Sequence, residues 1–196
     1  MTLTAAQKLF VKPLTAALAA LLLACAAPAW ADDHAQFQQG YTAYQAGNYA
    51  QALRLWQPLA QKGNAEAQFA LGLMYDKGQG VVKNDRQAAA WYQKAANQGD
   101  AAAQFNLGLM YDNGQGVAQN DQQAAALYQK ASNQGHAKAQ YNLGVMYFNG
   151  QGVARNYRQA AAWYKKVLAQ PDTPENAEAK ALARENLQGL SKRGVR

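Results

Sequence analysis

The sequence predicts an all-α fold, an α-α superhelix in which antiparallel helix pairs stack one on the next. The first observation is an internal repeat: the segment GLMYDKGQGV at residues 72–81 returns as GLMYDNGQGV at 108–117 and as GVMYFNGQGV at 144–153. The second is its period of 36 residues, which falls in the range of two-helix repeats. The third is the apolar spacing inside each copy, which is that of two helices.

The chain begins with a predicted secretory signal peptide, residues 1–31. Lys8 and Lys12 form its basic start, and the apolar stretch that follows is too short to span a bilayer. Ala29 and Ala31 mark a small-residue cleavage site, which predicts a periplasmic or secreted protein. In the alternative, Leu-Leu-Ala-Cys ending at Cys25 acts as a lipobox, and the protein is a membrane-anchored lipoprotein.

Composition narrows the function classes. Cleavage after Ala31 would remove the single cysteine, so stability must come from packing and not from disulfides. The formal net charge of the full chain is +7, with acidic residues interspersed. This pattern predicts a solvated surface, and contact with an anionic envelope surface is the alternative. No basic stripe for nucleic acid and no metal-ligand spacing is present, so we expect no nucleic-acid partner and no cofactor.

Each full repeat contains a helix A and a helix B. In the unit that spans about residues 64–99, helix A is predicted over about residues 64–77 and helix B over about 84–98. Asn84, Asn120 and Asn156 are the expected caps of the B helices, and Gly99 and Gly135 are expected to end two of them.

Two sets of glycines recur with the repeat. Glycine inside a helix costs about 1 kcal/mol relative to alanine, so Gly72, Gly108 and Gly144 predict close approach of helix B of the same unit. The Gly-Gln-Gly loops could cradle a phosphate, but no strand precedes them and no Gly-Lys-Ser/Thr follows. A turn with positive φ is the favoured interpretation.

This pattern resembles the Sel-one-like repeat (SLR) family, a relative of the tetratricopeptide repeat. The resemblance rests on Leu71-Gly72, Tyr75, Gly78-Gln79-Gly80-Val81, Asn84, Trp91-Tyr92 and Lys94-Ala95-Ala96, which recur at +36 and +72 with few changes. It covers about residues 35–170. It implies a right-handed superhelix whose concave groove is lined by the A helices.

The ends of the repeat array depart from the pattern. Three SLR units are predicted at 64–99, 100–135 and 136–171, after a shorter, tetratricopeptide-like pair at 32–63. Thr173 and Pro174 should start a last helix within 172–196, which also carries a basic tail. Solenoids need such caps for solubility. We expect the protein to be a monomer.

Tetratricopeptide geometry, as the resemblance implies it, places the binding residues of the groove on the A helices. Phe69, Phe105 and Tyr141 would form an aromatic ladder there, or would simply pack between helices. Phe148 replaces an acidic residue and could contact a partner or pack against the last helix. The full predicted set is Glu66, Phe69, Leu73, Asp76 and Lys77; Ala102, Phe105, Leu109, Asp112 and Asn113; and Lys138, Tyr141, Val145, Phe148 and Asn149.

Catalysis finds little support in the sequence. His136 stands at a helix start, where capping is the expected role, and His34 lies near the start of the mature chain. No serine lies in a Gly-x-Ser-x-Gly setting. We therefore expect a non-catalytic interaction module or scaffold that binds a protein or peptide partner. The alternatives are a weak cell-wall or β-lactam-acting enzyme, like cysteine-rich members of the family, and a lipid-anchored assembly factor.

Overall fold

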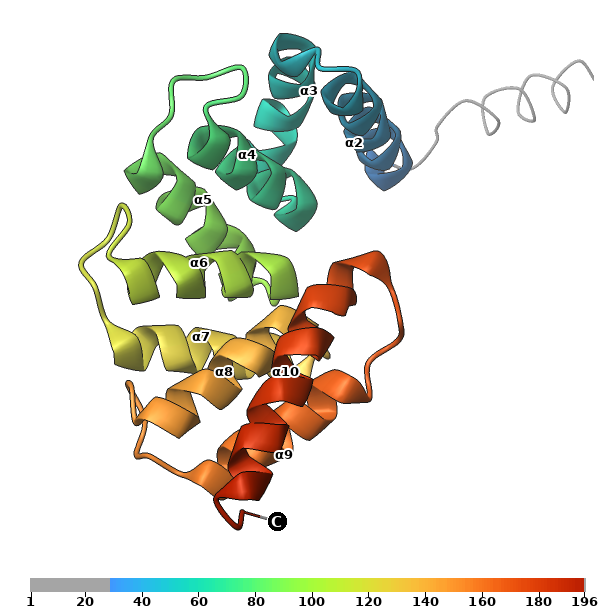
Figure 1. Ribbon diagram of the computed structural model, residues 1–196. Helices are drawn as coiled ribbons and strands as arrows, with labels where there is room; N and C mark the ends of the chain where they lie inside the picture. The colour runs from blue at the N-terminus through green and yellow to red at the C-terminus, as the bar shows by residue number, and fades with distance from the viewer. Residues whose placement is uncertain (1–28, 196) are drawn as a thin grey trace, which may run out of the picture.

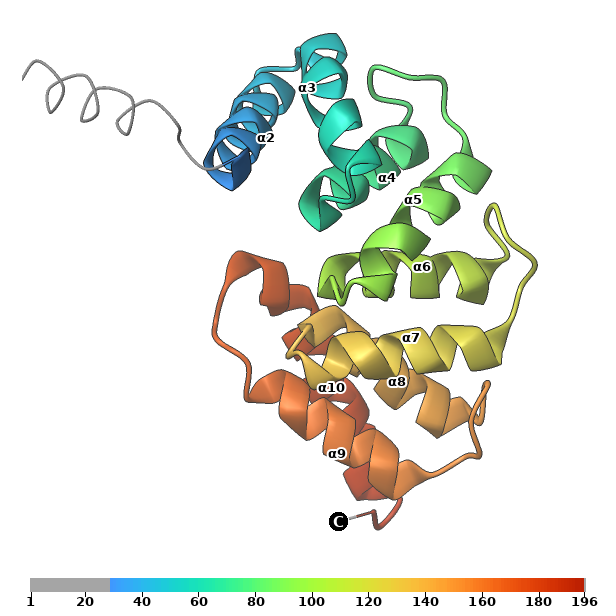
Figure 2. The same ribbon diagram turned by 180° about the vertical axis from the view of Figure 1, so that it is seen from behind.

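The computed structural model describes residues 29–195, and within them the chain folds into helices without any strand. The predicted all-α solenoid is confirmed. Figures 1 and 2 show the helix pairs following one another in an arc, with the last helix turned back across the end. The helices are α2 (Ala29–Gln45), α3 (Tyr49–Gln61), α4 (Ala65–Lys77), α5 (Asp85–Asn97), α6 (Ala101–Asn113), α7 (Asp121–Asn133), α8 (Ala137–Asn149), α9 (Tyr157–Leu168) and α10 (Pro174–Lys192).

The even-numbered helices from α2 to α8 are the A helices, and the odd-numbered helices are the B helices. Each A helix packs against its own B helix, and each B helix packs against the next A helix. The cap residues do what the sequence predicts, because the side chains of Asn84, Asn120 and Asn156 each accept a hydrogen bond from the first turn of a B helix. None of the helices within residues 29–195 has the length and apolarity needed to cross a membrane.

The signal-peptide and lipobox predictions concern residues that lie mostly outside the described part. Residues 1–28, including Cys25, are not described, and helix α2 already includes the backbone of the predicted cleavage site at Ala29 and Ala31. Both predictions therefore stay predictions.

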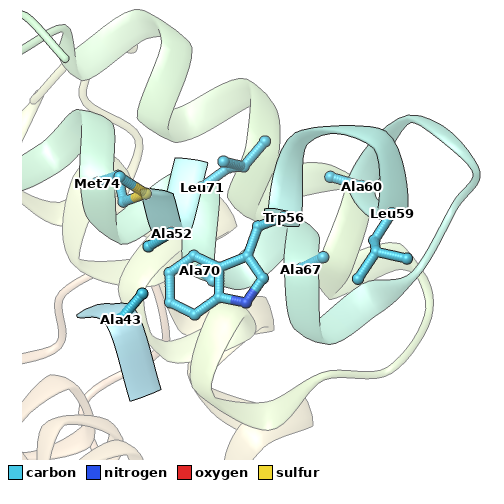
Figure 3. Packing of buried hydrophobic residues seen from close by; sticks show 9 residues of the cluster. All are labelled: Ala43, Ala52, Trp56, Leu59, Ala60, Ala67, Ala70, Leu71 and Met74. Carbon is cyan, nitrogen blue, oxygen red and sulfur yellow. The ribbon is translucent and has the colours of Figure 1, made fainter. Parts of the chain in front are cut away.

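In each of the three full units, a tyrosine of helix B packs directly on a glycine of helix A. Tyr92 is fully buried, and a Cβ atom added at Gly72 would lie 2.5 Å from its ring. Gly108 and Gly144 face Tyr128 and Tyr164 in the same way. The predicted close approach of helix B is therefore present in all three units. In the first pair, Gly40 faces Trp56, which fills the core shown in Figure 3.

Buried glutamines join neighbouring units. Gln104 is 4% exposed, and its Nε2 donates to the Ala96 carbonyl at the end of the preceding B helix, at 3.2 Å. Its Oε1 accepts from Gln134 Nε2 at 2.9 Å, and Gln134 also donates to the Gly99 carbonyl. Because buried polar groups are costly when unpaired, these bonds fix the register of one unit on the next.

The Gly-Gln-Gly loops are turns, as favoured above, and they also bind the preceding unit. Gly114 and Gly116 both have positive φ, near 70°. A Cβ atom at Gly116 would lie 2.3 Å from the Asp85 carbonyl oxygen, so this glycine lets the loop lie directly on the start of α5. The side chain of Gln115 between them reaches Asp76 of the preceding A helix at 3.4 Å.

Helix α10 packs across the end of the repeat array. It packs on α9 and α8, and its Ala179, Ala183 and Leu190 are buried in one cluster with Tyr164 and residues of α9. Thr173 stands at the N-cap position, but its side chain makes no capping hydrogen bond.

Candidate functional site

Two hollows open along the A helices, and we call the surface that contains them the A-helix face. The first hollow has a volume of about 220 Å³ and lies between α2 and α4, with the start of α6 at its rim. Its lining residues are Phe37, Tyr41, Tyr44, Trp56, Glu66, Phe69, Ala70, Leu73 and Asp100. The second, about 400 Å³, is lined by Phe69, Ala102, Phe105, Asn106, Gly135, His136, Ala137, Lys138, Glu175 and Asn176.

The three ladder aromatics occupy equivalent places but differ in access. The rings of Phe69, Phe105 and Tyr141 each lie 5.8 to 5.9 Å from the helix B tyrosine of their own unit. Phe69 and Phe105 also line the second hollow together. Tyr141 does not line this hollow. Its hydroxyl instead accepts a hydrogen bond from Asn186 of α10 at 3.3 Å. Two of the three rings therefore combine local packing with access to a hollow.

The two predicted groove aspartates bind the chain itself. Asp112 accepts from the Tyr128 hydroxyl at 3.3 Å and from Gln151 Nε2, in the loop of the next unit, at 2.9 Å. Asp76 accepts from Tyr92 and Gln115 in the same arrangement. Burial raises the pKa of Asp112 above its ordinary value, and the hydrogen bond from Tyr128 opposes this shift. These carboxylates fasten one unit to the next.

Phe148 takes the place of these aspartates in the last unit, where no further loop follows. Its ring lies 5.3 Å from Tyr157, which in turn replaces the helix B aspartate of the earlier units. The guanidinium of Arg193, at the end of α10, lies 5.4 Å from the Phe148 ring, and Val195 packs on the same cluster. Phe148 therefore packs against the end of the last helix, and it also lines a hollow of about 460 Å³ along α10, so contact with a partner stays a prediction. The aromatic pair of Phe148 and Tyr157, next to the chain end, thus replaces the aspartate hydrogen bonds that link the earlier units.

The remaining predicted residues divide by exposure. The charged and amide side chains are exposed, and among them Glu66 and Lys138 line the hollows, whereas the aliphatic residues are half-buried. Val145 packs in the cluster that α10 covers. The exposed residues are Glu66, Lys77, Asn113, Lys138 and Asn149, and the half-buried ones, besides Val145, are Leu73, Ala102 and Leu109.

His136 caps a helix, as expected, and also fills part of the A-helix face. Its Nδ1 accepts from the Ala139 amide at 3.2 Å, and its ring stacks on Phe105 with centroids 4.6 Å apart. Burial lowers the pKa of His136, and the charge of nearby Lys138 lowers it further. Both effects disfavour the protonated ring.

Three aromatic residues of α2 that line the first hollow were not among the predicted groove residues. Phe37, Tyr41 and Tyr44 of α2 occupy the positions that Phe69, Leu73 and Asp76 occupy in α4, since Gly40 plays the role of Gly72. Tyr41 is 47% exposed. The distance from Gly40 to Gly72 is 32 residues instead of 36, so an alignment on the repeat period does not find them. An alignment on the helical glycine would have found them.

An all-α array of stacked helix pairs, with hollows along one row of helices, is the architecture of a helical-repeat protein. The chain belongs to the Sel1 repeat family, because the model of the Sel1 repeat matches residues 35–64, 65–100, 101–136 and 137–170. The first match covers the segment that the sequence analysis described as tetratricopeptide-like. Proteins of this family are in general protein-interaction modules.

Solved structures similar to this chain are Sel1 repeat proteins. One is c5321, a protective antigen of uropathogenic Escherichia coli with an SLR fold: it is 34% identical with a TM-score of 0.74, over 83% of this chain and 34% of that one. This chain thus spans about a third of that protein's length. A Sel1 repeat protein from Oxalobacter formigenes is 34% identical with a TM-score of 0.67, over 81% of this chain and 70% of that one. No curated protein sequence matches the chain.

Proposed function

We propose that this protein is a non-catalytic interaction module of the bacterial envelope, which binds a protein or peptide partner along its A-helix face. The signal-peptide pattern of residues 1–31 supports export to the periplasm. The observation that carries the proposal is the first hollow, where aromatic rings from two consecutive A helices surround open space. Exposed aromatic side chains around a concavity are the usual anchors of protein interfaces.

The two ends of the A-helix face differ in what covers them. At the C-terminal end, α10 packs in one cluster with Val145, and its Asn186 donates a hydrogen bond to Tyr141. The chain's own last helix therefore contacts the part of the A-helix face that α8 contributes. At the N-terminal end, Tyr41 stays 47% exposed beside the first hollow. Partner binding is therefore proposed over α2, α4 and α6, and not over the full length of the array.

Site-specific photo-crosslinking tests this assignment. A photoreactive phenylalanine analogue is placed at Tyr41 or Glu66 on the A-helix face, and at Ala90 or Ala126 on exposed positions of helices α5 and α7. Crosslinks in intact cells should form from the first two positions and be absent from the other two. Crosslinks that arise only from Ala90 or Ala126 would place the partner on the opposite row of helices and refute the proposal.

A further inference from the structure

Two residues that line the first hollow differ from their equivalents in the later repeats. In the later units a buried tyrosine of helix B faces an asparagine of the following A helix, as Tyr92 faces Asn106. In the first pair, Trp56 replaces the tyrosine and Ala70 replaces the asparagine. The Trp56 indole donates instead to the Phe37 carbonyl at 3.1 Å. The Ala70 methyl group therefore lines the first hollow at the place where the polar Asn106 amide lines the second.

The size and walls of this hollow suit a large apolar side chain. Its volume of about 220 Å³ exceeds the roughly 150 Å³ of an apolar cavity that holds benzene. Phe37, Tyr41, Phe69 and Leu73 supply rings and an aliphatic side chain on several sides. Burying an apolar side chain among such groups is favourable in proportion to the area removed from water.

The charged residues at the rim are both acidic. Glu66 is exposed, and Asp100 is half-buried. Asp100 accepts from the Ala103 amide at 2.7 Å as the cap of α6. Neither carboxylate has an ion pair within residues 29–195, and no lysine or arginine lines the hollow.

The second hollow has a different charge. His136 takes the place of Asp100 in the repeat, and Lys138 lies there in the place of Glu66. The stacked ring of His136 on Phe105 also takes up the space next to that aromatic. Of the two hollows on the described A-helix face, only the first has two carboxylates and no cationic residue in its lining.

We propose that the first hollow binds a partner segment that inserts one bulky apolar side chain, flanked by lysine or arginine. The inserted side chain packs among Phe37, Tyr41 and Phe69, and the flanking cations lie against Glu66 and Asp100. The tyrosine and phenylalanine rings also favour nearby cations. This inference rests on the proposed function and specifies the partner chemistry of the same surface.

Three synthetic peptides in one glycine-serine frame test this specificity on the full-length protein. The first has a central tryptophan between lysines, the second has glutamate in place of lysine, and the third has alanine in place of tryptophan. Binding is followed by NMR shifts of the protein, with the Trp56 indole N–H as reporter. We expect the first peptide to bind at least about ten-fold more tightly than either of the others, with an affinity that falls as salt rises.

Matched variants separate charge from shape. Glu66→Gln with Asp100→Asn removes both charges and keeps the cap of α6, because asparagine caps helices well. This variant should lower the affinity for the lysine peptide about three- to ten-fold and should not lower the affinity for the glutamate peptide. Ala70→Asn restores the residue of the later repeats and should abolish the Trp56 shift. Glu178→Gln, an exposed carboxylate of α10, is the control and should change nothing.

Equal binding of the lysine and glutamate peptides, or shifts that avoid Trp56, would overturn the inference. Its failure is distinct from failure of the proposed function. If partners crosslink from Tyr41 while all three peptides fail to bind, the interaction module stands and the assigned chemistry falls. If nothing crosslinks from the A-helix face, the proposed function itself is refuted.

Discussion

Gly108 tests most simply how tightly the two helices of a unit are packed. A Cβ atom there would lie 2.7 Å from Cε1 and 2.8 Å from Cδ1 of Tyr128, a distance at which something must shift. Tyr128 is fully buried, so its ring has little freedom to move. Gly108→Ala gains about 1 kcal/mol of helix propensity, but overpacking a filled core costs about 1–3 kcal/mol.

The expected net loss for Gly108→Ala is therefore up to about 2 kcal/mol. For a chain of this size, each kcal/mol lowers Tm by about 2–4 °C. Gly108→Val adds two more methyl groups at the same contact and should lose considerably more. Thermal and urea unfolding followed by circular dichroism measure both variants.

Gly189 in α10 supplies the control for Gly108. It also lies inside a helix, but a Cβ atom there meets nothing within 4 Å. Gly189→Ala should therefore raise the stability by about 0.5–1 kcal/mol. If Gly108→Ala is stabilising to the same degree, the close contact between helix A and helix B is absent and the packing argument fails.

Three further predictions concern a buried amide, a titrating cap and the last helix. Gln104→Leu should lower the free energy of unfolding by about 1–3 kcal/mol in urea titrations, because it leaves the Ala96 carbonyl and the Gln134 amide without this partner. An unchanged free energy would contradict the role of the buried glutamines in joining neighbouring units. Burial lowers the pKa of His136, so stability should fall as pH drops through 6.5 toward the lower folded value, and His136→Asn, which keeps a cap, should flatten this dependence; equal pH profiles would exclude that effect. Leu190 is fully buried, so Leu190→Ala should cost about 2–5 kcal/mol and speed amide exchange in α9 and α10 first; uniform acceleration over the array would show that α10 is not a local cap.

The internal repeat allowed the fold to be predicted from the sequence. A fixed period, asparagine caps and helical glycines each determine local structure, and the stacked pairs follow from satisfying them together. The tyrosine that meets Gly72 is also visible in the sequence, once the glycine is taken as a close contact. These features depend on neighbours within a unit or between adjacent units, and such contacts repeat with the period.

The candidate site was less predictable because it depends on the ends, where the period breaks. The place of α10 on Tyr141 and Val145 follows from the length and direction of the loop after α9, which no repeat pattern encodes. For Phe148 the sequence left partner contact and packing against the last helix open, because its neighbours Tyr157 and Arg193 come from different elements. The hydrogen bonds of Asp76 and Asp112 were not predicted, because one of the donors to each lies in a loop of the next unit.

Cysteine labelling at two equivalent positions tests the central claim most directly. Tyr41 and Val145 occupy the same place on their A helices, but Val145 lies in the cluster that α10 covers. Single cysteines are placed at each position in a Cys25→Ala background, and the rate of thiol modification is measured. We expect fast labelling at residue 41, slow labelling at residue 145, and fast labelling at both once α10 is removed. Equal rates in the intact chain would contradict a face that is open at its N-terminal end and closed by the chain's own last helix.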